Sequence, residues 1–244
     1  MRVYIGYDPR DHLAYRVAEH TIKERASIDI EVLPLKDWEL RQKRIYWRGY
    51  RVDASGQMWD DIDGKPFSSQ FSFTRFAVPA LEEYGDDWVL FMDADMMIRG
   101  DIAEVLDLAG EAEGRPAVMC VKHNHQPSEG RKMDGVIQAA YNKKNWSSFM
   151  LMKPNRCHDL SLYALNNYGG GTLHGMVWAE RGAIGELPPE WNHLAGYDAP
   201  GGEPKNVHFT LGTPDMDGPH SPKTEWDAEW WDALDRARKG IYAA

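Results

Sequence analysis

The sequence predicts an α/β fold, with a central sheet flanked by helices, on three observations. Residues 2–8 and 28–35 are short β-rich segments, and residues 12–26 between them carry apolar side chains at near-helical spacing. This β-α-β start predicts two parallel strands joined by a right-handed crossover. Residues 88–98, "WVLFMDADMMI", have the apolar character of a buried central strand, and helical and strand-like segments continue to alternate after it.

Residues 37–69 lack a regular pattern and are predicted to form an excursion from the sheet. They include "QKRIYWRGYR", in which basic and aromatic side chains are interleaved, and the turn sequences "DASGQ" and "DGKP". A hairpin that lies over a binding site and a solvated surface hairpin explain this pattern equally well. A nucleic-acid patch is the least favoured interpretation, because the surrounding chain is acidic.

The remaining elements follow from turn signals and periodicity. Residues 72–85 predict a helix in which Pro79 marks a kink or a late start. The later predictions are a helix at 101–109, strands at 116–122 and 146–154, a helix ended by glycines at 160–171, a short strand and turn within 182–194, a strand at 205–210 and an amphipathic helix at 223–240. No internal repeat or linker is evident, so residues 1–244 are predicted to form one domain.

Composition and charge exclude several classes of protein. The chain of 244 residues is 43% hydrophobic and 27% charged, which is typical of globular proteins. Its formal net charge of −10 argues against a nucleic-acid partner and against a polybasic contact with anionic lipid. The first ten residues lack the pattern of a signal peptide, and no run of about 18 apolar residues predicts a membrane span. Cys120 and Cys157 are expected to be buried thiols in a reducing cytoplasm. Nothing in the sequence predicts the oligomeric state.

Asp93 and Asp95 interrupt the apolar run at 88–98. Side chains alternate along a strand, so the two carboxylates are expected on one side, and ligands of open α/β sheets bind beyond the carboxyl ends of strands. Two carboxylates held close together repel each other, and a divalent cation relieves that repulsion. Oxygen ligands favour Mg²⁺ or Mn²⁺ over Zn²⁺. Alternatively, one aspartate caps a turn and the other is solvated, and the Asp-x-Asp triplet alone does not decide between these interpretations.

His208 supports the metal interpretation. It lies in the predicted strand at 205–210, within "VHFTLG", and is followed by a glycine turn. A lone histidine is more often a core or surface residue. Two carboxylates and one imidazole, however, suit Mn²⁺ in an octahedral site with positions left open for a substrate, and a diphosphate is the usual partner of such an ion.

Several motifs together resemble the family 8 glycosyltransferases, the glycogenin and bacterial lipopolysaccharide galactosyltransferase type. "VYIGYD" is similar to that family's first strand and nucleotide-binding turn, and "TRFAVPALEEYGDDWVLFMDADMMIRGDIAEVLDL" to its arginine helix and Asp-x-Asp strand. "KNWSSFMLMKPN", "ELPPEWNHLAG" and "VHFTLG" resemble its later motifs. The resemblance covers most of the chain in the family's order.

The resemblance implies a GT-A fold, Rossmann-like with a mixed central sheet, and transfer of a hexose from a nucleotide sugar, usually UDP-linked, with retention at the anomeric carbon. The acceptor, a glycan, a lipid-linked sugar or another molecule, is not indicated. The resemblance also implies Mn²⁺, or Mg²⁺ as second choice, held by Asp93, Asp95 and His208. The residues expected near the donor are Tyr7, Asp8, Arg75, Ala94 and Gly212, with the first two near the nucleobase. The residues expected near the sugar or the acceptor are Trp146, Ser147, Ser148, Trp191 and Asn192.

The sequence departs from the family at three places. The family's Asn-Ser-Gly appears here as "WSS", residues 146–148. The family's diphosphate-binding lysine after the final histidine is missing, because "GTPDM" offers only Asp215 there, which leaves Lys223 or Arg75 for that role. The family's Asp-Gln pair has no clean counterpart in residues 170–185, where Glu180 is the only acid and therefore the candidate catalytic residue.

Two other functions compete with a glycosyltransferase. A nucleotidyltransferase shares the sheet and the metal but is expected to have a glycine-rich basic loop after the first strand, and "GYDPRDHLAY" has one glycine. A non-catalytic sugar- or metal-binding domain is disfavoured by the presence of both the aspartate pair and the late histidine, although the missing lysine keeps this alternative open.

Overall fold

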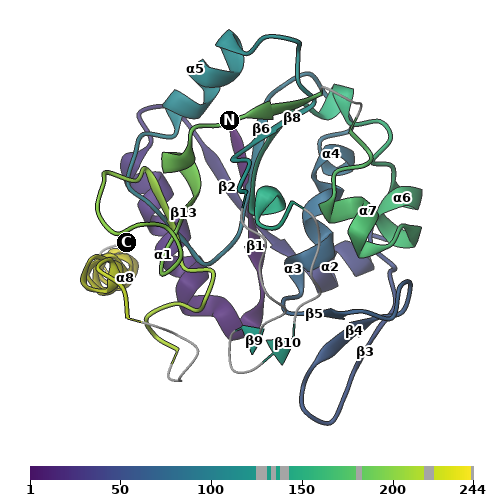
Figure 1. The fold of residues 1–244 in the computed structure, drawn as a ribbon, viewed down its shortest axis with the longest axis horizontal. Helices are drawn as coiled ribbons and strands as arrows, with labels where there is room; N and C mark the ends of the chain where they lie inside the picture. The colour runs from purple at the N-terminus through teal and green to yellow at the C-terminus, as the bar shows by residue number, and fades with distance from the viewer. Residues whose placement is uncertain (125–130, 133–135, 138–142, 180–182, 217–222, 243–244) are drawn as a thin grey trace.

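A six-stranded mixed sheet lies at the centre of the computed structural model, which describes residues 1–124, 131–132, 136–137, 143–179, 183–216 and 223–242 (Figure 1). Its strand order is β12-β8-β11-β6-β1-β2. The bounds of these strands are β1 Arg2–Tyr7, β2 Glu31–Lys36, β6 Val89–Met92, β8 Val118–Cys120, β11 Phe149–Met152 and β12 Ile184–Glu186. β1 pairs in parallel with β2 and β6, whereas β11 is antiparallel to both of its neighbours. The predicted α/β class and the parallel start are therefore confirmed.

The prediction of one strand over residues 88–98 is wrong. The chain leaves the central sheet at Met92, turns through Asp93–Asp95 and forms β7 (Met96–Ile98) in a second sheet of order β13-β14-β7. β13 is His193–Leu194 and β14 is Asn206–His208. The strand breaks because β6 pairs with β1 and β11, while β7 pairs antiparallel with β14. Apolar residues on both sides of the two aspartates fit one buried strand as well as two strands joined by a turn.

Helices cover both faces of the central sheet (Figure 1). α1 (His12–Arg25) lies on one side, and α2 (Asp37–Gln42), α3 (Phe71–Thr74), α4 (Val78–Leu81), α6 (Leu162–Asn167) and α7 (Gly170–His174) lie on the other. α5 (Ala103–Glu111) follows β7. The main core contains fully buried side chains of β1, β6 and β11, such as Ile5, Phe91 and Phe149. Burial on both faces explains why these strands are apolar throughout.

The C-terminal helix α8 spans Asp227–Tyr242, later than the predicted 223–240, and packs against α1. Trp230 and Leu234 are fully buried there with Val17 of α1, Val207 of β14 and Met97 of β7. α8 thus closes a second, smaller core that holds β7 and β14 in place. The amphipathic stripe of the helix is a packing surface, as the sequence indicated.

The excursion at 37–69 consists of α2 and a three-stranded antiparallel sheet with β3 (Tyr50–Val52), β4 (Met58–Asp60) and β5 (Pro66–Phe67). Its basic segment is only partly a surface feature, since Arg48 is 1% exposed and forms an ion pair with Asp60. The hairpin is therefore anchored to the body of the protein.

Other local predictions are confirmed with adjusted bounds. The helix at 72–85 is interrupted by a 3₁₀ turn, and Pro79 lies in the first turn of α4, where its missing N–H costs no hydrogen bond. Gly170, expected to end a helix, instead begins α7. Outside these elements, β9 (Arg131–Lys132) and β10 (Val136–Ile137) pair antiparallel.

Both cysteines are buried free thiols, as predicted, and burial raises the pKa of each to about 12. Among the helices of the described residues, none combines the length and the apolar character needed to cross a membrane.

Candidate functional site

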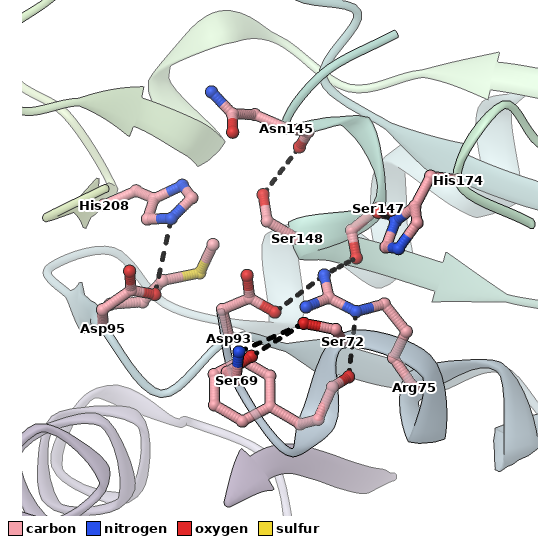
Figure 2. A network of polar contacts seen from close by, with 12 residues as sticks. Ser69, Ser72, Arg75, Asp93, Asp95, Asn145, Ser147, Ser148, His174 and His208 are labelled. Atoms are coloured by element: carbon pink, nitrogen blue, oxygen red, sulfur yellow. Dashed lines mark hydrogen bonds and ion pairs between the residues drawn. The ribbon is translucent and has the colours of Figure 1, made fainter. Parts of the chain in front are cut away.

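The candidate site is a cavity beside the carboxyl ends of β1 and β6 and the amino end of β11 (Figure 2). Because β11 runs antiparallel to β6, Ser148 before β11 lies next to Asp93 after β6, and the Asp93 amide donates to the Ser148 carbonyl over 2.8 Å. The cavity is lined by Asp11, Ser68, Ser69, Phe71, Ser72, Arg75, Asp93, Asp95, Lys143, Lys144, Asn145, Ser147, Ser148, His174, His208 and Thr210. This is the end of the sheet at which ligands of α/β proteins bind.

Asp93, Asp95 and His208 meet in this cavity, with one ligand atom of each within 4.8 Å of the others. The pairing of β14 with β7 sets His208 opposite Met96, next to Asp95. The imidazole Nε2 of His208 lies 3.4 Å from Asp95 Oδ1. The structure therefore brings together the three residues that the sequence predicted as metal ligands.

Asn192 fixes the orientation of the His208 ring. Its amide nitrogen donates to the Ser148 hydroxyl over 3.0 Å and to the Asn145 carbonyl over 3.3 Å. The amide oxygen of Asn192 therefore faces His208 Nδ1, 2.9 Å away, and accepts a hydrogen bond from the Nδ1–H group. With the proton on Nδ1, the Nε2 lone pair of a neutral imidazole points toward Asp95, which is the arrangement expected of a metal-binding histidine.

Arg75 holds Asp93 from the opposite side. One guanidinium nitrogen lies 3.0 Å from Asp93 Oδ1 and donates to the Ser147 carbonyl over 2.8 Å, while Nε donates to the Phe71 carbonyl over 3.2 Å (Figure 2). Gly6 of β1 allows Phe71 to approach, because a Cβ at Gly6 would lie 2.5 Å from the Phe71 ring. Arg75 thus lines the cavity, as expected of a donor-binding residue, and it also positions a candidate metal ligand.

Replacing Arg75 by Lys is expected to weaken Mn²⁺ binding by about 10- to 100-fold, the range typical for loss of a group that orients a metal ligand. The charge is kept, but an ammonium on a flexible stem cannot reproduce the contacts to Asp93, Ser147 and Phe71 together. Titration calorimetry with Mn²⁺ measures the effect. Arg51→Lys, at an exposed position of β3, is the control, and unchanged Mn²⁺ affinity in Arg75→Lys would contradict the positioning role.

The donor set fits a hard divalent cation. Asp93 is 8% exposed and His208 is 2% exposed, so two carboxylates and an imidazole lie together with little solvent to screen them. Carboxylate oxygens with one imidazole are ligands that suit Mn²⁺ or Mg²⁺, and these residues occupy only part of an octahedral coordination shell. An ion held by these three residues would keep coordination positions for a ligand in the cavity.

Asp11 is an acidic residue of the cavity that the sequence analysis missed. It is 5% exposed, and burial, with the nearby carboxylates of Asp8 and Asp95, raises its pKa to about 8. The raised pKa favours the protonated Asp11 carboxyl, which can donate a hydrogen bond to a ligand. The available signal was its place in "YDPRD", directly after the first strand.

Ser147, His174, Lys143 and Lys144 also line the cavity. The Ser147 hydroxyl hydrogen-bonds to His174 Nδ1 over 2.9 Å, and burial lowers the pKa of His174 well below its ordinary value, so that the ring is neutral. His174 and the two lysines were missed by the sequence analysis. For the lysines the signal was their position at the start of "KNWSSFMLMKPN", since Lys144 is the first residue of that motif and Lys143 precedes it.

Several predicted site residues do not line the cavity. Asp8 is fully buried, and its carboxylate accepts hydrogen bonds from Arg10 and from the Gln70 amide. Trp191 is also fully buried, with its ring stacked on Phe149, and so has no face free to stack on a sugar. Asn192, expected at the sugar, instead orients His208.

Four more of the predicted site residues do not line the cavity either. Ala94 is buried in the turn between the two aspartates, and Gly212, with φ of 123°, forms the turn after β14. Trp146 donates its indole N–H to the His123 carbonyl over 3.0 Å. Tyr7 is partly exposed at the end of β1, where its ring contacts that of Trp38. Glu180, the candidate catalytic residue, lies outside the described residues.

Comparison with solved structures identifies the fold as that of glycosyltransferases. The chain matches the WbbM bifunctional glycosyltransferase with a TM-score of 0.54 and 15% identity, over 96% of this chain and 51% of that one. It matches GlyE of Streptococcus pneumoniae TIGR4 with a TM-score of 0.55 and 16% identity, over 99% of this chain and 64% of that one. An active-site mutant of LgtC gives a TM-score of 0.53 and 11% identity, over 97% of this chain and 96% of that one. The chain thus spans about half of WbbM and less than two thirds of GlyE, and at these identities the likeness establishes the fold alone.

A closer relative defines the family. The chain is 39% identical over 223 residues to Protein CDI of Arabidopsis thaliana, which covers 88% of this chain and 80% of that protein. The chain belongs to the family of Protein CDI. No protein-family model matches it.

Proposed function

We propose that this chain is a metal-dependent glycosyltransferase of the family 8 type, which moves a hexose from a nucleotide sugar, with UDP as the favoured nucleotide, to an acceptor with retention at the anomeric carbon. The observation that carries the proposal is the cluster of Asp93, Asp95 and His208, with ligand atoms within 4.8 Å of one another, in a cavity at the carboxyl ends of β1 and β6. A glycosyltransferase fold supports the same conclusion.

In this proposal, Asp93, Asp95 and His208 hold Mn²⁺ or Mg²⁺. When bound, the ion supplies positive charge to the diphosphate of the donor and stabilises it as a leaving group. Arg75 and Asn192 keep Asp93 and His208 in a fixed orientation, so that little reorganisation is needed when the donor binds. Because their partners are buried, Asp93 and His208 are held in position before the substrate binds. A flexible pair at the surface would not hold them in this way.

The nucleobase is proposed to lie against Tyr7, at the carboxyl end of β1. Trp38, which is 39% exposed and contacts the Tyr7 ring, offers an adjacent aromatic face. Ser147 and Ser148 remain candidates for contacts to the sugar, since both line the cavity. Glu180 remains the candidate carboxylate near the reacting carbon.

Binding of UDP is expected to depend on Mn²⁺, with an affinity at least about tenfold higher in Mn²⁺ than in EDTA, because the diphosphate is held partly through the ion. Mg²⁺ is expected to support binding less well. Calorimetry with UDP measures this binding. A hydrolysis assay over a panel of nucleotide sugars then measures whether the donor is cleaved.

Two outcomes of these experiments would redirect the proposal. Equal UDP affinity with and without EDTA would contradict the metal role. Release of inorganic diphosphate from a nucleoside triphosphate, without release of a nucleoside diphosphate from any nucleotide sugar, would favour a nucleotidyltransferase instead.

A further inference from the structure

The turn Lys143–Asn145 forms part of the cavity wall. All three of its residues line the same cavity as Asp93 and His208. The turn is fixed at Asn145, whose φ of 65° is left-handed and whose carbonyl accepts hydrogen bonds from the Ser148 hydroxyl over 2.6 Å and the Asn192 amide over 3.3 Å. Figure 2 shows Asn145 across the cavity from Asp95 and Asp93. The network that orients His208 therefore also positions this turn.

The cations of the cavity are not equally available to a ligand. Arg75 is engaged with Asp93 and with two backbone carbonyls. Lys143 donates to the Gly175 carbonyl over 2.9 Å and lies over the Trp146 ring at 5.3 Å. For Lys144, the structure records no hydrogen bond or ion pair with any other described residue. Burial lowers the pKa of Lys144, and no described carboxylate offsets that effect.

Charge balance indicates what Lys144 is suited to bind. A divalent cation and the Arg75 guanidinium beside Asp93 together oppose the two carboxylates of Asp93 and Asp95, which leaves about one positive charge. A donor diphosphate then brings negative charge that the metal site alone does not compensate, and burial of uncompensated charge is costly. Residues 213–216, "TPDM", which follow the late histidine motif, provide Asp215 and no base. A cation in addition to the metal ion and Arg75 is needed, and the turn before β11 provides one.

We infer that Lys144 contacts the diphosphate of the nucleotide-sugar donor and stabilises the leaving nucleoside diphosphate, an inference that rests on the proposed function. As the bond between the anomeric carbon and the diphosphate oxygen breaks, its electron pair stays on that oxygen. The acceptor hydroxyl oxygen forms the new bond to the carbon, and its proton passes to solvent. The Lys144 ammonium offsets the charge that develops on the diphosphate, as an electrostatic contact aimed at the leaving group.

Lys144→Met tests this role against Lys144→Arg, Lys144→Gln and the control Lys43→Met, at an exposed position after α2. In Mn²⁺, Lys144→Met is expected to weaken UDP binding by about 10- to 100-fold, because a charge-assisted contact is lost. Lys144→Gln should show a similar loss, and Lys144→Arg should restore part of the affinity. Binding of uridine, followed by ligand-observed NMR, should not change, because uridine has no phosphate.

The outcomes separate this inference from the proposed function. If wild-type protein binds UDP with Mn²⁺ and both neutral variants bind it equally well, the role of Lys144 is overturned and the proposed function stands. Equal losses of UDP and uridine affinity would indicate a structural role and would also overturn it. If wild-type protein shows no Mn²⁺-dependent binding of UDP or of other nucleoside diphosphates, both proposals fail. A melting temperature measured on each variant shows whether Lys144→Met is folded, and Lys144→Gln provides the test if it is not.

Discussion

Asp95→Asn is expected to weaken Mn²⁺ binding by more than about 100-fold and to remove Mn²⁺-dependent UDP binding and transfer. Loss of a group that merely orients a metal ligand costs about 10- to 100-fold in metal affinity, so loss of a charged ligand should cost more. The substitution keeps the size of the side chain. The Asp95 carbonyl, which accepts from the Phe209 amide over 2.8 Å, is also unaffected.

Metal-free stability is the measurement that distinguishes a ligand from a structural residue. Asp93 and Asp95 are like charges held close together, so neutralising one of them relieves repulsion in the absence of the ion. The melting temperature of Asp95→Asn in EDTA should therefore match or exceed that of the wild type, while the stabilisation that added Mn²⁺ gives the wild type should be lost.

Asp87→Asn is the matched control, since Asp87 is exposed and precedes β6 at the opposite end of the same strand. It should change neither Mn²⁺ affinity nor stability. A large fall in the metal-free melting temperature of Asp95→Asn, with Mn²⁺ affinity retained, would mean that Asp95 is a structural residue.

The meeting of Asp93, Asp95 and His208 in one candidate metal site could be predicted from the sequence because each belongs to a short motif next to a strand. Asp93 and Asp95 follow a strongly apolar run, and His208 lies in a late strand. Ligands of α/β folds bind at the carboxyl ends of strands, so these local patterns indicate that all three residues lie at the same end of the fold. The path between them could not be predicted. The sequence indicated one strand over 88–98, whereas the turn at Asp93–Asp95 is imposed by pairing of β7 with β14, which is a contact between distant segments.

Residues in turns were the hardest to predict. Asp11 and Lys144 line the cavity, but neither has a periodic pattern, and the direction of a side chain in a turn depends on what the turn packs against. The reverse error concerns Trp191 and Asn192. Their types suit sugar binding, but both are fully buried, because the segment before β13 packs under β14. Residue type indicates what a side chain can do, whereas burial decides whether a ligand can reach it.

The relation between Asn192 and His208 changes how the histidine should be tested. His208 is buried and its Nδ1 is bonded to Asn192, so removal of the ring would leave the Asn192 amide oxygen without its donor as well as removing a metal ligand. A loss of stability in His208→Ala therefore does not argue against a metal role. Asp95, whose side chain can be neutralised without change of size, gives the clearer experiment.

The buried ion pair of Arg48 and Asp60 is expected to be the most sensitive structural position of the excursion at 37–69. Each side chain is 1% exposed, and two hydrogen bonds of 2.7 and 2.6 Å join the guanidinium to the carboxylate. The third guanidinium nitrogen donates to the carbonyls of Leu165 and Tyr168, over 3.2 and 2.7 Å, and so ties the hairpin to the segment around α6. The guanidinium carbon also lies 4.0 Å from the centre of the Phe73 ring.

Arg48→Met is therefore expected to lower the free energy of unfolding by about 3–5 kcal/mol, the usual cost of removing one partner of a buried ion pair. Met fills most of the space, but it leaves the Asp60 carboxylate buried without its cation and two carbonyls without a donor. The double variant Arg48→Met/Asp60→Leu should recover much of this loss, because no uncompensated charge remains. Urea unfolding of both variants, with Arg51→Met as the exposed control, measures the effect, and the control should change stability by less than about 0.5 kcal/mol. A loss below about 1 kcal/mol in Arg48→Met would mean that water or a rearranged hairpin satisfies Asp60, and that the excursion is not anchored through this pair.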